Sequence, residues 1–258
     1  MQNNAYLCHK TPYYMRRLLS LIALMSWLLT ACSNDNEEQM IHIKRMGDSN
    51  PGLALSMLDS ISTKGMNEKT QMIYDMLHVR LCDKAYIVAK SDERIKAVVD
   101  YFTKHGTTRE KQEAYYYAAS VYRDMKDTPR ALEFYLKSRD VTQEGEYDSL
   151  MLRNTYSQLN RLYYSVQHYR ESLRAAESEE QTNKALGIDD IVSKVHVICS
   201  LMKIGQDERA MLMQDSILGI IEEDPKKIDS GTLCQILTNQ QSAAAKGGTR
   251  SRHHVKDG

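Results

Sequence analysis

Residues 112–143 constrain the fold of this chain more than any other stretch. Their first half carries small and aromatic side chains at spacings of three and four, which places them on one face of a helix: Tyr115, Ala118, Ala119 and Tyr122. Small residues let two helix backbones approach closely, and the rings fill the remaining space. The stretch therefore predicts a helix that packs tightly against a neighbour.

A second helix is predicted directly after a turn. Thr128 and Pro129 provide an N-cap and a first-turn proline, which are typical of a helix start. One face of this helix carries Ala131, Tyr135 and Ser138. The resulting helix hairpin has a second side that only further hairpins can bury.

This pattern resembles the tetratricopeptide repeat (TPR), a helix–turn–helix unit of about 34 residues. The small and aromatic residues named above occupy the family's packing positions, and Lys126-Asp127 stands where the family has a Gly-Asp turn. Gln143 replaces the closing proline. The resemblance implies that more units follow.

Two further units repeat the pattern after about 41 and 38 residues. The second begins near Arg153, and its two helix faces carry Tyr156, Leu159, Asn160, Tyr163, then Tyr169, Ser172 and Ala176. The third begins near Ile191 and carries Val197, Ile198, Leu201, a turn at Gly205, then Ala210. The sequence thus predicts an all-α fold, a TPR-like superhelix of antiparallel helix pairs over residues 112–224.

Residues 40–111 predict degenerate helical pairs in front of these repeats. Asn50-Pro51 starts one helix, whose expected packing face carries Leu53, Met57 and Ile61. Thr107 and Glu110 form a capping box that leads into the first clear repeat.

The first 31 residues predict a targeting segment. Basic residues precede the apolar stretch 18–29, and the segment ends in Leu29-Thr30-Ala31-Cys32. This ending resembles the lipobox of bacterial lipoproteins, which implies acylation of Cys32. An ordinary signal peptide followed by a chance cysteine is the alternative. Residues 32–39 then form a polar tether.

The stretch from about residue 29 to 220 resembles TPR lipoproteins of the Bacteroidetes, whose longer members add repeats, a membrane helix and a cytoplasmic regulatory region. This resemblance implies a lipid-anchored protein–protein interaction scaffold of the cell envelope, on the periplasmic side or the cell surface. It further suggests an input module of a signalling system. The alternative is a glycan-binding lipoprotein of a nutrient-uptake system.

Composition and motifs argue against nucleic-acid binding and catalysis. After removal of residues 1–31, 34 acidic and 31 basic residues remain, so no basic surplus favours nucleic acid. The histidines are scattered, and no HExxH, GxSxG or CxxC motif occurs. We therefore expect no enzyme activity, no cofactor and no metal. Cys82 and Cys199 fall within apolar helix patterns and are predicted to be core thiols rather than a disulfide.

The predicted partner-binding residues follow from the expected hairpin register. First helices of successive TPR units line the concave face. The side chains expected there lie beside the packing face: Tyr116, Ser120 and Arg123 in the first unit, and Ser157, Arg161 and Tyr164 in the second. Arginine with exposed tyrosine favours protein binding. An ordinary solvated helix face is the alternative.

The C-terminal residues 225–258 predict a weak capping helix over 228–241 and then a polar, glycine-containing tail. Our hypothesis is that the chain is a shortened member of its group. A complete protein with a flexible end is the alternative.

Overall fold

The computed structural model describes residues 36–223, and in this range the chain folds into helices joined by short turns, without strands. The helices form two compact units that divide between Tyr101 and Phe102. No helix among the described residues is both long and apolar enough to cross a membrane. The predicted targeting segment, Cys32 and the predicted capping helix lie outside the described residues.

The first unit contains a helix over residues 36–46, then α2 (Pro51–Asp59), α3 (Glu68–Lys84) and most of α4 (Glu93–His105). Asn50 accepts a hydrogen bond from the Leu53 amide and thereby caps α2, as predicted. The expected packing face of this segment is correct only in part. Ile61 is buried and Met57 packs against the core of this unit. Leu53, however, is half exposed, and Ala54 and Leu58 are buried instead.

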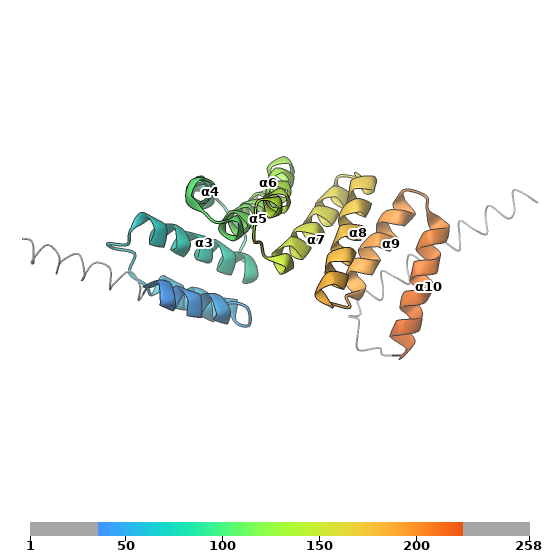
Figure 1. Cartoon of the computed structure of the whole chain (residues 1–258), viewed down its shortest axis with the longest axis horizontal. Coiled ribbons are helices and arrows are strands. Elements are labelled where there is room, and N and C mark those ends of the chain that lie inside the picture. Colours follow the sequence, from blue (N-terminus) through green and yellow to red (C-terminus); the bar gives the residue numbers. More distant parts are fainter. Residues whose placement is uncertain (1–35, 224–258) are drawn as a thin grey trace, which may run out of the picture. The chain divides into compact units, whose positions relative to one another are not determined.

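Over its described residues, 102–223, the second unit stacks three helix hairpins (Figure 1). They are α5 (Thr108–Asp124) with α6 (Thr128–Asp140), α7 (Ser149–Ser165) with α8 (Tyr169–Leu186), and α9 (Ile191–Lys203) with α10 (Asp207–Glu223). A short 3-10 turn, η1 (Val141–Gln143), follows α6. The three hairpins coincide with the three predicted repeats, which confirms the all-α repeat architecture. The predicted start of the repeats at residue 112 falls inside α5.

Local sequence explains the helix starts. Thr107 and Glu110 form the predicted capping box at α5, because the Thr107 side chain accepts from the Glu110 amide and the Glu110 carboxylate accepts from the Thr107 amide. At α6 the cap is Asp127 rather than the predicted Thr128, since the Asp127 side chain accepts the hydrogen bond from the Arg130 amide. The buried face of α6 carries Ala131, Tyr135 and Ser138, as predicted.

Within residues 36–223, five helices are followed by a residue with left-handed backbone, and the amide after that residue bonds back to a carbonyl five residues earlier: Tyr86, Lys126, Gln167, Gly187 and Gly205. Only glycine adopts this conformation without strain. A side chain costs about 1 kcal/mol there. Lys126 therefore takes over the turn role of glycine in the Gly-Asp pair of the repeat motif.

Contacts between hairpins involve residues that lie far apart in sequence. Gln112 of α5 donates to the Asp148 carbonyl at 3.0 Å and accepts from the Asp148 amide at 2.8 Å. Arg153 of α7 pairs with Asp190 in the corresponding place one repeat later. Asp148 and Asp190 are the N-caps of α7 and α9. Each first helix thus holds the start of the next first helix.

Candidate functional site

The candidate site is the side of the second unit on which the first helices α5, α7 and α9 follow one another. α5 contacts α7, and α7 contacts α9, in addition to the contacts within each hairpin. Positions on these three helices therefore form a continuous surface across the repeats. The predicted partner-binding residues all come from α5 and α7.

Two of these predictions are wrong, because Tyr116 and Ser120 are buried. Tyr116 is 8% exposed, and its ring packs edge-on against Tyr117 and Tyr135 with centroid distances of 5.2 and 5.5 Å. Ser120 is 1% exposed and shares a hydrogen bond of 3.1 Å with the Tyr135 hydroxyl. The buried arc of α5 extends beyond the single predicted face, because α6 and α7 pack against the same helix.

Arg123 joins α5 to α7. Its guanidinium donates to the Gln158 side-chain oxygen at 3.4 Å and to the Tyr135 hydroxyl at 3.5 Å, and pairs with Asp124 at 2.9 Å. Arg123 is therefore partly buried and partly neutralised. Gln158 belongs to this surface although the sequence analysis did not select it. Its position beside Ser157, three residues before Arg161, was the available signal.

α7 provides the outward part of the surface. Ser157, Arg161 and Tyr164 are spaced by four and three residues and share one face of the helix. Arg161 is exposed, and no ion pair is found for it within residues 36–223. Ser157 and Tyr164 are partly buried.

Tyr164 connects this face to the next repeat. Its ring meets the Tyr169 ring edge-on at 5.4 Å, and the Lys203 ammonium lies 5.9 Å from the Tyr169 centroid. Burial raises the pKa of Tyr164, so its hydroxyl stays protonated at neutral pH. We call the combined surface the α7 patch, which consists of Arg123, Ser157, Gln158, Arg161, Tyr164, Tyr169 and Lys203. Its exposed charges are the cations of α7 and α9.

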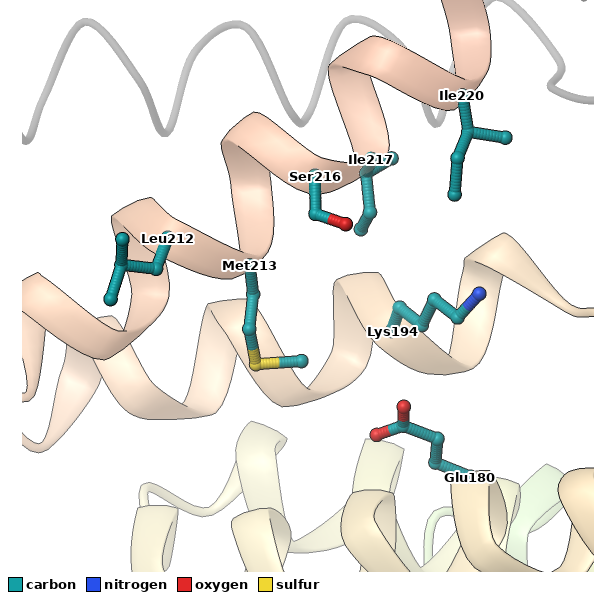
Figure 2. A pocket seen from close by; sticks show the side chains of 7 residues that line it. All are labelled: Glu180, Lys194, Leu212, Met213, Ser216, Ile217 and Ile220. Atoms are coloured by element: carbon teal, nitrogen blue, oxygen red, sulfur yellow. The ribbon is translucent and has the colours of Figure 1, made fainter.

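An open groove lies elsewhere in the same unit, between α8, α9 and α10 (Figure 2). Its volume is about 330 Å³, and Lys194 and Glu180 face a largely apolar wall on α10 made by Leu212, Met213, Ser216, Ile217 and Ile220. Lys194 is paired with Asp189 at 2.8 Å. The groove offers no aromatic ring.

In the first unit, His78 lies between Cys82 and Asp59 and contacts both. The thiol is 3.6 Å from His78 Nδ1, and His78 Nε2 is 3.7 Å from the Asp59 carboxylate. Burial raises the pKa of Cys82 and lowers that of His78, so both groups are neutral near pH 7. A nucleophilic cysteine needs a lowered pKa. The contact between Cys82 and His78 follows from their i, i+4 spacing on α3.

Neither of the two cysteines within residues 36–223 forms a disulfide; Cys199 is buried and Cys82 partly buried. In that same range, no group of three or more histidine, cysteine or acidic side chains is close enough to hold a metal ion.

Comparison with known proteins supports the fold alone. No protein-family model and no curated protein matches the sequence. Solved structures do match. TPR-like repeats of a kinesin light chain-like protein from Podosopora anserina share 13% identity over 75% of this chain and 98% of theirs, with a TM-score of 0.58. A Rap protein complexed with Competence and Sporulation Factor shares 13% identity over 99% of this chain and 81% of its own, with a TM-score of 0.55. The chain therefore has the fold of TPR-like repeat proteins.

Proposed function

We propose that this chain is a protein-interaction scaffold of the bacterial cell envelope, anchored by a lipid on Cys32 and binding its partner at the α7 patch. The exposed Arg161 beside the aromatic pair Tyr164–Tyr169 is the observation that carries the proposal. Arginine and tyrosine are enriched at the centres of protein interfaces. The Rap neighbour, itself solved in a complex, is consistent with a binding role for such an array.

The charge of the patch defines the chemistry of the partner. Arg161 and Lys203 are both exposed, whereas Arg123 is already paired with Asp124. An extended segment with a carboxylate near an aromatic or aliphatic side chain would meet the free cations and the two rings together. The proposed partner is therefore an acidic segment of another envelope protein, and the proposed role is input to a signalling system.

Photo-crosslinking tests the patch. A benzoylphenylalanine placed at position 157, on the same face of α7 as Arg161, should form an adduct with the partner in intact cells. The matched control is position 178, because Ser178 is likewise a partly buried serine but lies on the second helix α8. Adducts of equal yield at both positions, or adducts at 157 that survive Tyr164→Ala, would show that the patch is not the binding surface.

The lipid anchor has an independent test. Metabolic labelling with a fatty-acid analogue should label the chain, and Cys32→Ala should abolish the label and stable membrane retention through this anchor. A wild-type chain that remains unlabelled would overturn the anchor while leaving the binding surface untouched.

Glycan binding is the less favoured function. Such sites rely on exposed aromatic platforms, and the first repeat buries its rings at Tyr116, Tyr117, Tyr122 and Tyr135.

A further inference from the structure

The loop between α3 and α4 presents three consecutive apolar side chains to solvent. Tyr86 is 94% exposed, Ile87 48% and Val88 61%. We call these three residues the apolar tip. Single exposed apolar residues are ordinary on a protein surface, whereas a contiguous exposed group points to a contact site.

The backbone at the tip makes the choice of tyrosine unusual. Tyr86 has a φ of +58°, in the left-handed region where glycine is the favoured residue. The Ile87 amide bonds to the Cys82 carbonyl at 2.9 Å and closes the same turn that Gly205 forms after α9. Tyr86 therefore combines a strained backbone with an exposed ring, so neither the turn nor the core explains why a tyrosine stands at this position.

We propose that the apolar tip inserts into the interface of a lipid bilayer and forms a second membrane contact of the first unit; this rests on the proposed lipid anchor. The three side chains of the tip are consecutive and all exposed. A bilayer surface can accept all three at once, whereas a narrow protein groove binds every second side chain of an extended segment. Tyrosine is enriched at the level of lipid headgroups. Lys84 and Lys90 flank the tip with no acidic residue between them. Lys84 is paired with Asp48, whereas Lys90 is exposed and suits the headgroup region.

The first unit places the tip and the proposed anchor at opposite ends of one helix. Thr70, in the first turn of α3, donates to Glu37 at 3.3 Å. Asp48 pairs with Arg80 and Lys84 in the last turns of α3, at 2.8 and 3.0 Å. The helix 36–46 therefore runs parallel to α3, and the chain enters the unit beside the start of α3.

This placement of the tip and the anchor predicts how α3 is oriented relative to the bilayer. The 17 residues of α3 span about 25 Å at 1.5 Å per residue. Cys32 precedes the described residues by a stretch that reaches at most about 14 Å when extended. Both contacts can touch one bilayer when α3 lies close to the membrane plane. An anchor alone would leave the unit free to swivel.

Tryptophan fluorescence with brominated lipid tests the proposal on the lipid-anchored chain. Trp27 is the only tryptophan of the sequence. It lies in the predicted targeting segment that is removed from the anchored form, and Trp27→Phe keeps any unprocessed chain free of tryptophan as well. Tyr86→Trp then reports on the tip, and Gln167→Trp is the matched control, because Gln167 occupies the equivalent left-handed turn after α7 with a φ of +64°. The vesicles contain phosphatidylglycerol and brominated phosphatidylcholine.

We expect loss of emission from position 86 and unchanged emission from position 167. A chain that carries the fatty-acid label and floats with the vesicles, yet shows no quenching at 86, overturns the tip and leaves the anchor intact. Quenching at 86 without the label overturns the anchor and supports the tip. Blue-shifted emission at 86 without vesicles means that protein covers the tip, which overturns the proposal.

A second variant separates membrane contact from folding. Tyr86→Gly relieves the strained backbone, so its thermal midpoint should rise. In the lipid-anchored Tyr86→Gly chain, α3 should no longer be held in one orientation. A fluorescent label on Lys69 should then show a broader distribution of depths in the bilayer. An unchanged depth distribution would contradict insertion of the tip.

Discussion

The two junctions between repeats solve one structural problem with different chemistry. Gln112 and Arg153 each lie four residues into a first helix and reach the N-cap of the next first helix. At the first junction a neutral amide holds the backbone of Asp148 through two hydrogen bonds. At the second a guanidinium pairs with the side chain of Asp190 and also donates to Asn183 at 3.0 Å.

The side chains around the two junctions differ in the same way: those at the first junction are neutral, and those at the second are charged. Ser138 shares a hydrogen bond of 3.4 Å with Thr155 across the first junction. Across the second, Glu179 is 1% exposed and lies 3.1 Å from His196 and 4.0 Å from Arg153. The contact between repeats therefore stays at the same position in both junctions, but it is neutral at the first and ionic at the second. The charged junction is the more vulnerable one, because loss of Arg153 takes a partner from the buried Glu179 and from the partly buried Asp190.

Arg153→Ala should have the largest effect. It leaves the buried Glu179 with His196 alone and removes the partner of Asp190, so we expect a loss of about 3 kcal/mol in the free energy of unfolding. Urea denaturation followed by circular dichroism measures it. Arg153→Gln, which places at the second junction the same amide side chain that Gln112 supplies at the first, should recover part of the loss. Equal losses for alanine and glutamine would mean that geometry, not charge, governs this junction.

Gln112→Ala should cost less. It removes two hydrogen bonds to the Asp148 backbone, and leaving these groups without partners costs about 2 kcal/mol. The same urea titration gives the value. A loss larger than that of Arg153→Ala would reverse our ranking of the two junctions.

Inside the hairpins, the second repeat has a buried polar pair at the positions where the first repeat has two buried alanines. Ala119 and Ala131 of the first repeat correspond to Asn160 and Ser172 of the second, 41 residues later. The Asn160 amide donates to the Ser172 carbonyl and hydroxyl, both at 2.9 Å. Asn160→Ala should cost about 1.5 kcal/mol.

A double-mutant cycle sharpens this comparison. With Ser172→Ala, the two losses should be non-additive by about 1 kcal/mol, since the double variant restores the alanine pair of the first repeat. Strict additivity would show that the hydrogen bonds of Asn160 do not depend on the Ser172 side chain.

Arg161→Ala should have the smallest effect on stability. Arg161 lies two turns after Arg153 on the same helix but is exposed, so its removal should change the free energy of unfolding by less than about 0.5 kcal/mol. The yield of the partner adduct should fall with this variant when the crosslinker stands at a neighbouring position of the α7 patch. A clear loss of stability would place Arg161 in the packing instead.

Local features of this fold were predictable from the sequence, whereas features that depend on neighbours were not. The capping box of Thr107 and Glu110 and the buried face of α6 need only short spacings, and both are present. Tyr116 was assigned to the wrong side because its burial depends on Tyr135, which lies on another helix. Leu53 was expected on the packing face of α2, yet the structure buries Ala54.

The candidate site was predictable to a similar degree. Arg161 is exposed as expected, since it lies on an outward face whose position follows from the repeat register. The contact between Arg123 and Gln158 joins residues 35 positions apart, and no local pattern announces it. Likewise, Arg153 marked the start of a repeat in the sequence, but its role at the junction requires the position of Asp190.

The clamps at Asp148 and Asp190 also give the array a direction of assembly. Each first helix holds the N-cap of the helix that begins the next repeat, so an earlier repeat prepares the start of a later one. In a repeat array, stability is a sum of unit and nearest-neighbour terms. Fraying that begins at α10 leaves both clamps intact, whereas opening α5 releases the start of α7. Amide hydrogen exchange should therefore be faster in α9 and α10 than in α5, and unfolding should proceed from the later repeats toward the earlier ones.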